Sequence, residues 1–168
     1  MLRQVAIRAS AAARSAAGPA AAAQRRHLAE AAVAADKLHF NFLLPGGAIQ
    51  KDAAVDMVLV PASSGVMGIL PRHAPTVAQL RPGVVEVHAD GAKEKYFVSS
   101  GFAFVHKERT DVCAVAAAPL ADLDAAAVTQ GVADAQAAMA AAKNDTEKAE
   151  AQIGLDTYTA MRSALAMA

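Results

Sequence analysis

The 168-residue sequence predicts an N-terminal antiparallel β-sandwich followed by a C-terminal antiparallel two-helix hairpin. Apolar residues recur with a period of two between residues 37 and 117, which is the pattern of half-buried strands. Turn residues separate these short runs without intervening helices, and this favours a sandwich or barrel. After Pro119 the apolar spacing changes to steps of three and four, as in an amphipathic helix.

The first thirty residues differ in composition from the rest of the chain. Residues 1–29 contain five arginines and no acidic residue, together with many alanines and two serines. An arginine-bearing, acid-free leader is typical of an organelle transit peptide. We therefore expect residues 1 to about 30 to be removed on import. The alternative is a disordered, alanine-rich tail.

The predicted β domain covers residues 36–119. Its first strand alternates Leu38, Phe40 and Phe42 with the polar His39 and Asn41, so we expect one face of this strand to be buried. Further alternating runs follow at residues 55–60, 85–88, 96–98 and 102–104.

Two turns in this domain have specific signals. Asp90-Gly91 lies between two alternating runs and predicts a two-residue hairpin, because both central residues of such a turn take a positive φ. Pro82-Gly83 fits a type II turn, in which proline fixes φ and the following glycine takes a positive φ.

The predicted helical domain covers residues 120–168. Asp122 or Asp124 can cap the start of its first helix. Asn144, followed three residues later by Glu147, fits a capping box at the start of a second helix.

Two glycines lie inside the predicted helices. Gly131 and Gly154 are at similar distances from the junction between the helices, so in an antiparallel hairpin they would face each other. A glycine inside a helix costs about 1 kcal/mol relative to alanine, and a close helix crossing would offset that loss. We therefore predict that Gly131 and Gly154 are contact residues of the hairpin.

The composition argues against several classes of function. The formal net charge is zero, which disfavours a nucleic-acid-binding protein. No stretch approaches the roughly 18 to 20 continuous apolar residues of a membrane span. The single Cys113 excludes an internal disulfide and is expected to be a buried, inert thiol.

We predict no catalytic, metal or cofactor site. Four histidines lie in separate predicted strands or loops without the clustering that a zinc site needs: His39, His73, His88 and His106. Gly65 and Gly68 lack the following Lys-Ser/Thr of a phosphate-binding loop.

The stretch Ser63–Val87, SSGVMGILPRHAPTVAQLRPGVVEV, is apolar yet rich in proline and glycine. It could be a series of turns around a short strand. It could also be a contact surface, because apolar groups beside a loop often meet another part of the structure or a partner.

Part of this stretch resembles a family motif. The run Gly65-x-x-Gly68-Ile69-Leu70-Pro71-x-His73-Ala74-Pro75, followed by LRPGVV at residues 80–85, is similar to the signature of the small rotor subunit of F-type ATP synthases. This subunit is called delta in mitochondria and epsilon in bacteria and chloroplasts. The resemblance extends over about residues 38–168.

The resemblance implies a sandwich followed by two antiparallel helices and a non-catalytic role at the foot of the central stalk. The implied partners are the gamma subunit, the c-subunit ring and the small mitochondrial epsilon subunit. The implied location is the matrix side of the mitochondrial inner membrane, with the membrane reached only through the complex. A plastid address is the alternative, because the leader composition does not separate the two organelles.

The resemblance also implies site residues. The residues that correspond to the c-ring interface are Pro45, Gly65, Val66 and Met67. Many bacterial members carry an acid in this loop, whereas this chain has Val66 and Met67, so we expect an apolar or backbone contact. The other motif residues are assigned to a subunit interface or a structural corner: Gly68, Leu70, Pro71, His73 and Pro75.

Two other functions remain open. One is a regulatory hairpin that senses ATP or inhibits hydrolysis, as in some bacterial relatives. Their motif has an arginine where this chain has Ala127, and without that cation an anion loses its partner. The other is a free-standing, ligand-binding β-sandwich with a helical dimerisation hairpin.

Overall fold

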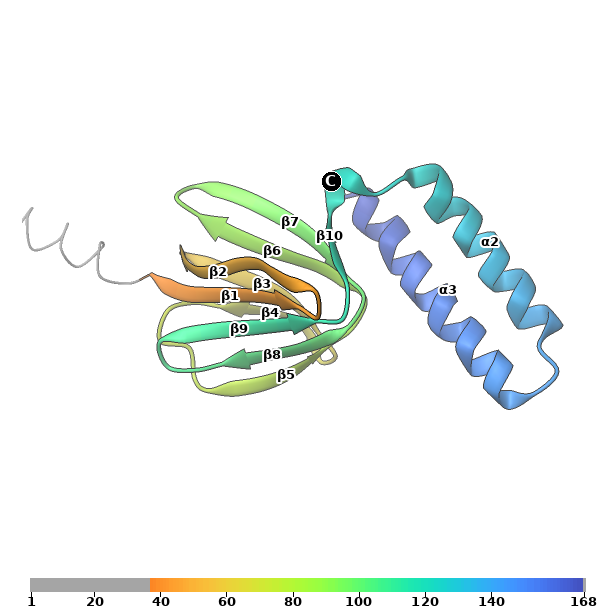
Figure 1. Cartoon of the computed structure of the whole chain (residues 1–168), viewed down its shortest axis with the longest axis horizontal. Coiled ribbons are helices and arrows are strands. Elements are labelled where there is room, and N and C mark those ends of the chain that lie inside the picture. Colours follow the sequence, from red (N-terminus) through yellow and green to blue (C-terminus); the bar gives the residue numbers. More distant parts are fainter. Residues whose placement is uncertain (1–36, 168) are drawn as a thin grey trace, which may run out of the picture. The chain divides into compact units, whose positions relative to one another are not determined.

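The computed structural model describes residues 37–167 (Figure 1). The predicted transit peptide at residues 1–30 lies outside the described residues. Within them, strands are followed by a short 3-10 helix, η1 (Leu120–Asp122), and two α-helices, α2 (Ala125–Ala141) and α3 (Asp145–Leu165). The predicted order of a β-sandwich followed by a helical hairpin is confirmed.

The strands form two layers. The hydrogen-bonded order is β10-β7-β6-β3-β5-β8-β9-β1-β2, and β4 pairs with β3 outside this path. All pairs are antiparallel except β1 with β9. The two layers join where β3 meets β5 through one residue pair, Ala62 with Leu80. The strand bounds are β1 Leu38–Leu44, β2 Gly47–Val55, β3 Met57–Ala62, β4 Gly65–Ile69, β5 Thr76–Leu80, β6 Gly83–Ala89, β7 Ala92–Val98, β8 Gly101–Val105, β9 Arg109–Ala114 and β10 Ala117–Pro119.

The main core lies between the layers. The alternation predicted for the first strand is confirmed, since Leu38, Phe40 and Phe42 are buried and His39 is exposed. The Phe42 ring meets the Tyr96 ring edge-on, with ring centroids 5.4 Å apart, a favoured aromatic geometry. The opposite layer and the connecting strands contribute mainly branched aliphatic residues, including Val58, Val60, Ile69, Leu80, Val85, Val87 and Val98.

The alternating run predicted at residues 55–60 is two strands, because the chain turns at Asp56 between β2 and β3. The Asp56 amide donates to the carbonyl of His88 at 2.8 Å, and the Asp56 carboxylate accepts from the amide of Asp90. These bonds hold the corner. The corner also shifts the alternation of buried and exposed residues by one position, so that Val55 and Val58 are both buried.

Of the two predicted turns, one is confirmed and the other is wrong. Asp90 and Gly91 have φ values of 51° and 79°, as the two-residue hairpin requires. Gly83 does not have a positive φ. A Cβ atom at Gly83 would lie 2.8 Å from the Pro61 side chain, so this glycine is needed for close approach between strands.

The two helices begin as predicted. The Asp124 side chain caps α2 by accepting from the amide of Ala126, and the Asn144 side chain caps α3 by accepting from the amide of Glu147. In turn, the Glu147 carboxylate accepts a hydrogen bond from the amide of Lys143 at 2.8 Å. This is one residue earlier than in a standard capping box.

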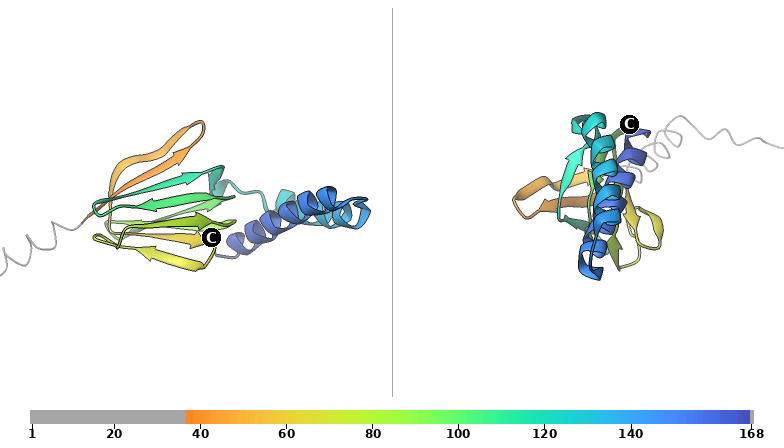
Figure 2. Two further views of the ribbon diagram at one scale, coloured as in Figure 1. Left: turned by 90° about the horizontal axis from the view of Figure 1, so that it is seen from below. Right: turned by 90° about the vertical axis from the view of Figure 1, so that its right-hand side faces the viewer.

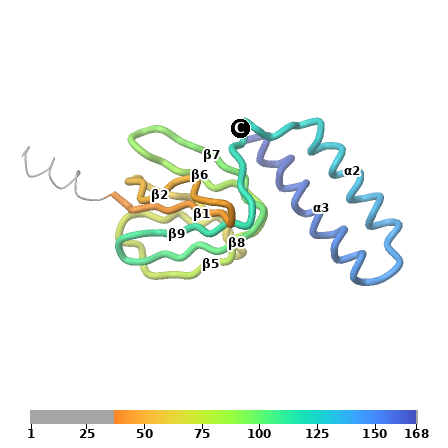
Figure 3. The backbone as a smooth tube through the Cα atoms, viewed as in Figure 1, coloured from red at the N-terminus to blue at the C-terminus, as the bar shows by residue number. Residues whose placement is uncertain are grey.

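The hairpin contacts the sandwich through a second apolar cluster. Phe97 of β7, Leu120 of η1 and Ala164 of α3 are buried together, and Lys95 donates to the carbonyl of Met167 beyond the last turn of α3. The chain passes from β10 through η1 into α2 (Figure 3). Residues 36–168 cluster as one compact unit, so the domain division at residues 119 and 120 stays a prediction.

The two helix glycines do not face each other. A Cβ atom at Gly131 would lie 2.5 Å from the Tyr158 ring, whereas one at Gly154 would meet only the Cβ of Ala135, at 3.9 Å. The register therefore pairs Gly131 with Tyr158 and Gly154 with Ala135, about one helical turn away from the expected pairing. The reason is steric, because an aromatic ring can lie this close to a helix only where a Cβ is missing.

We expect Gly131→Ala and Gly154→Ala to have opposite effects on the free energy of unfolding. Helix propensity alone favours alanine by about 1 kcal/mol at either position. At Gly131 the added methyl group must displace the Tyr158 ring, which should give a net loss of about 1–3 kcal/mol. Urea unfolding monitored by circular dichroism measures both variants. Equal stabilisation by the two substitutions would contradict this helix packing.

We expect Thr110→Val to raise the free energy of unfolding by about 1 kcal/mol. Thr110 is fully buried, and its hydroxyl has no hydrogen-bond partner within residues 37–167. Valine keeps the branched shape and removes the unpaired hydroxyl. Thr76→Val is the matched control, because the Thr76 hydroxyl donates to the Ala74 carbonyl at 2.9 Å and its removal should give no gain. Chemical denaturation of both variants is the test, and unchanged or lower stability of Thr110→Val would be inconsistent with it.

Candidate docking surfaces

The predicted interface residues lie at two opposite ends of the sandwich. The turn end contains the β3–β4 turn at Ser63–Ser64, and the loop end contains the loop at residues 70–75, because β4 runs between these two connections. Pro45 belongs to the turn end, since it lines a hollow together with Leu80, the residue that pairs with the end of β3. The structure therefore separates Pro45 and Val66 from the His73 loop.

At the turn end, Val66 provides exposed apolar surface. Its exposed fraction is 73%, whereas Met67 packs against the main core. Gly65 has a φ of 133°, which L-residues rarely adopt, and Pro45 is exposed in the β1–β2 turn. Val66 and Met67 thus point to different sides of β4, and Val66 is the one that a partner can reach.

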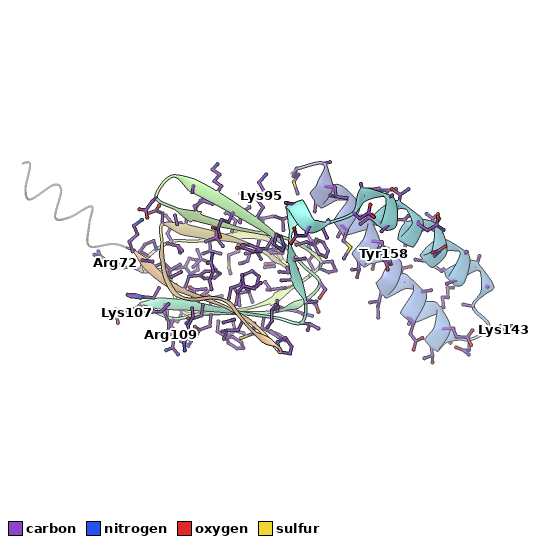
Figure 4. All side chains as sticks on the ribbon, turned by 45° about the horizontal axis from the view of Figure 1, so that its top comes forward. Arg72, Lys95, Lys107, Arg109, Lys143 and Tyr158 are labelled. Carbon is purple, nitrogen blue, oxygen red and sulfur yellow. The ribbon has the colours of Figure 1, made fainter. Side chains whose placement is uncertain are left out.

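At the loop end, the motif residues form a tight corner. The His73 amide donates to the Leu70 carbonyl at 3.2 Å, and Arg72 has a φ of 63°. The His73 ring donates from Nδ1 to the Ala74 carbonyl at 2.8 Å, so this ring is held by its own loop. Leu70 remains 53% exposed. Figure 4 shows Arg72, Lys107 and Arg109 at this same end.

A third surface was not predicted from the sequence. We call it the outer patch, and it consists of Val77, Phe102, Phe104 and Val115, which are 66%, 48%, 36% and 64% exposed. Val77 and Phe104 are direct neighbours across β5 and β8, and the Phe102 and Phe104 ring centroids are 6.3 Å apart. A hollow of about 530 Å³, lined in part by Phe102, Cys113 and Val115, adjoins the patch. A contiguous exposed apolar patch of this kind typically marks a docking site.

An alternating run was expected at residues 102–104, which lie in β8, but the face that it buries was not. Ala103 and Val105 face the core, and the two phenylalanines face outward. The sequence did contain a hint of this orientation. Both faces of this short strand are apolar, which is typical of a strand that is buried on both faces, by its own core and by a partner. The expectation of a buried Cys113 was also wrong. Cys113 is partly exposed on the outer side of β9, opposite Phe102.

Three of the four histidines in residues 37–167 lie beside a carboxylate, and His39 and His106 line the same hollow at the loop end. His39 Nδ1 lies 2.8 Å from Asp52, His88 Nε2 lies 3.2 Å from Glu86, and His106 Nε2 lies 3.6 Å from Asp111. Within residues 37–167, no group of three or more His, Cys, Asp or Glu side chains could hold a metal ion. None of the helices in this part of the chain is long and apolar enough to cross a membrane.

Lys37 forms ion pairs that connect three parts of the loop end. The Lys37 ammonium lies 2.6 Å from Asp56 and 2.8 Å from Asp90, linking the start of β1 to the β2–β3 corner and to the β6–β7 turn. Hydrogen bonds to Asp56 and Asp90 raise the pKa of Lys37. The same bond from Lys37 lowers the pKa of Asp56 below its ordinary value of 3.8.

We expect Lys37→Met to reduce stability at pH 7 and to lose this effect in acid. A carboxyl whose pKa is lowered by folding stabilises the protein above its unfolded pKa, and that contribution disappears as the pH falls through the folded pKa. The wild-type and variant urea midpoints should therefore differ above about pH 4 and converge below it. Lys107→Met, which changes another lysine at the loop end, should match wild type at every pH. A pH-independent difference for Lys37→Met would contradict this ion pair.

Comparison with known proteins gives a consistent result. Residues 37–120 match the family described as "ATP synthase, Delta/Epsilon chain, beta-sandwich domain". The mitochondrial ATP synthase subunit delta' of Ipomoea batatas is 47% identical over 77% of this chain and 65% of its own length. The mitochondrial subunit delta of Agaricus bisporus is 43% identical over 78% and 82%, and the epsilon chain of Parvibaculum lavamentivorans is 41% identical over 76% and 97%.

The fold also matches a solved structure. A chain in the cryo-EM structure of the Euglena gracilis mitochondrial ATP synthase (OSCP/F1/c-ring in rotational state 1) superposes with a TM-score of 0.72 at 27% identity. The match covers 77% of this chain and 81% of that chain. The chain spans 65% and 66% of the length of the relatives from Ipomoea batatas and Pisum sativum.

Proposed function

The chain belongs to the delta/epsilon family of ATP synthase subunits, and we propose that it is a non-catalytic subunit of the central stalk. In this role it would couple rotation of the c-subunit ring to the gamma subunit, and so to ATP synthesis. The observation that carries the proposal is the match to the Euglena gracilis structure. That match covers 77% of the chain, more than residues 37–120 alone, so it includes part of the hairpin as well as the sandwich.

The proposed partners are the gamma subunit, the c ring and the small mitochondrial epsilon subunit, on the matrix side of the mitochondrial inner membrane. The names of the relatives support a mitochondrial location. The matched Euglena gracilis structure comprises OSCP, F1 and the c ring, which supports neighbours from F1 and the c ring for this chain. Contact with the membrane would then be made only through the complex.

A coupling subunit has to transmit torque without deforming. The sandwich suits this role, because its two layers enclose one continuous apolar core and Lys37 fastens the loop end with two short ion pairs. The hairpin is attached through the cluster of Phe97, Leu120 and Ala164. These contacts favour a rigid connector.

Docking would use apolar surface. We assign the c-ring contact to the turn end, where Pro45, Gly65 and Val66 are accessible and Met67 supports them from the core side. We assign the outer patch to the gamma subunit, because aromatic side chains are enriched at the centres of protein interfaces. At the loop end, Gly68, Leu70, Pro71, His73 and Pro75 would serve as a structural corner, since the His73 ring is bound to its own loop.

Expression of the tagged full chain in its own cells tests the proposal directly. On a blue-native gel of solubilised mitochondria, the chain should migrate with the assembled ATP synthase. Migration as a free protein from the matrix would overturn the proposed function and favour the free-standing binding domain.

Two substitutions that introduce a negative charge should distinguish the roles of the two docking surfaces. Val66→Asp should weaken attachment of the stalk to the c ring, and Phe102→Asp should weaken binding to the gamma subunit. Each should reduce affinity roughly tenfold or more, because a carboxylate in an apolar contact must be desolvated. Both side chains are exposed, so the variants should fold.

The readouts are proton-driven ATP synthesis in a reconstituted enzyme and recovery of the chain with isolated F1. Val66→Asp should lose coupling but remain with F1, whereas Phe102→Asp should be lost from F1. Val66→Thr, which keeps the shape without a charge, is the control. Full coupling by Val66→Asp would rule out the turn end as the ring contact.

A further inference from the structure

The edge strands of the sandwich differ in how well they are protected against pairing with another chain. The edge strands are β2 and β5 in one layer and β10 and β4 in the other. Exposed edges are normally blunted by charge, proline, short length or bulges. β10 has three residues and ends at Pro119, and β2 carries Lys51 and Asp52 and is irregularly paired with β1. β5, with the sequence TVAQL, has no charge or proline either, but its last residue, Leu80, is paired with β3. β4, with the sequence GVMGI, has neither a charge nor a proline. In Figure 2, the orange β1–β2 hairpin and the yellow β3–β4 hairpin lie on opposite sides of the sandwich.

The register of β3 shows which backbone groups of β4 point away from it. The Pro61 carbonyl accepts from the amide of Arg81 at 3.0 Å, so it faces away from β4, and proline has no amide to donate. Pro61 is opposite Val66, so this pair is not hydrogen-bonded across the hairpin. Such pairs alternate with bonded ones along an antiparallel ladder. The amide and carbonyl groups of Val66 and Gly68 therefore point away from β3, past the free edge of the sheet.

These outward groups are accessible. Within residues 37–167, β4 pairs only with β3. Val66 is 73% exposed and Gly68 has no side chain to block an approaching strand. Met67 and Ile69, whose backbone groups pair with β3, pack toward the core. The result is a short, uncharged template of two residues with unpaired donors and acceptors.

We propose that this edge binds an extended, uncharged segment of another subunit of the complex by strand addition. The segment would place a branched or aromatic side chain beside Val66 and would pair its backbone with Val66 and Gly68. The proposal rests on the proposed function in that the strand comes from the same complex. Of the apolar and backbone contacts expected in this loop, it assigns a backbone contact and names the two residues that make it.

Two other occupants fit less well. A second copy of this chain, paired through five residues, would bury far less than the roughly 1,200 Å² of a stable interface. A subunit that is already held elsewhere on the rotor needs no such area. The chain's own residues 1–29 are dominated by alanine and arginine, which are poor strand formers or charged, so they do not match an apolar edge.

Amide hydrogen exchange at single-residue resolution tests the proposal. In the free full-length chain, the amides of Val66 and Gly68 should exchange rapidly, and those of Met67 and Ile69 slowly. In the assembled ATP synthase, exchange at Val66 and Gly68 should slow by about a hundredfold or more. Rapid exchange at both positions in the intact complex would overturn this inference and leave the proposed function standing. Absence of the chain from the complex would overturn both.

A pair of variants checks the result independently. Val66→Pro removes the outward amide at an edge position where proline is tolerated, and Val66→Thr keeps both the amide and the branched shape. Val66→Pro should lower recovery of the chain with the complex at least several-fold, while Val66→Thr matches wild type and both retain the wild-type circular dichroism spectrum. Equal recovery of the two variants would count against strand addition. Slow exchange at Val66 in the free chain would also count against the proposal in two cases. If it appears only at high protein concentration, the occupant is a second copy of the chain. If it is lost when residues 1–30 are removed, the occupant is the chain's own leader.

Discussion

The end of β3 is the constraint on which the rest of the sandwich depends. Ala62 pairs with Leu80 and joins the two layers, while the Pro61 carbonyl accepts from Arg81 and holds β5 in place. The Pro61 ring lies so close to Gly83 that only glycine fits there. Because the Pro61 carbonyl points away from β4, the backbone groups of Val66, which lies opposite Pro61, also point away from β3. The contacts of Pro61 and Ala62 therefore determine three features of the sandwich: the crossing between the layers, the start of β6 and the free edge of β4.

The apolar residues of the sandwich serve two purposes. One set fills the space between the layers, and the other set, the outer patch, remains exposed on β5 and β8. The exposed part of an aromatic side chain adds nothing to the stability of an isolated domain, because only surface that is removed from water contributes. Their position beside a hollow lined by Cys113 and Val115 agrees with the proposed role as a subunit of a larger complex. The polar loop end shows the opposite pattern, with Lys37, His39 and His106 paired to carboxylates.

The hairpin is a different kind of structure from the sandwich. Its first helix is rich in alanine and buries only Val128, Gly131, Val132 and Ala135, so little side-chain area holds the two helices together. The contact of Tyr158 with Gly131 supplies an aromatic ring where small residues alone would pack weakly. At the other end of α3, Ala164 and the carbonyl of Met167 connect the hairpin to β7. These contacts hold the hairpin to the sandwich.

The sequence by itself determined the features that depend on neighbouring residues. These are the alternation of Leu38, Phe40 and Phe42, the Asp90-Gly91 turn, and the helix cap at Asn144, since each follows from local backbone and side-chain chemistry. For the first helix the sequence offered Asp122 or Asp124, and the structure selects Asp124. The family motif around His73 indicated the fold and the family. The tertiary structure alone decided which face of β8 is buried, why Gly83 is a glycine, how Gly131 meets Tyr158, and that Val66 and His73 lie at opposite ends. Each of these depends on a contact between residues far apart in the chain, and no local pattern specifies which strand or helix supplies the partner.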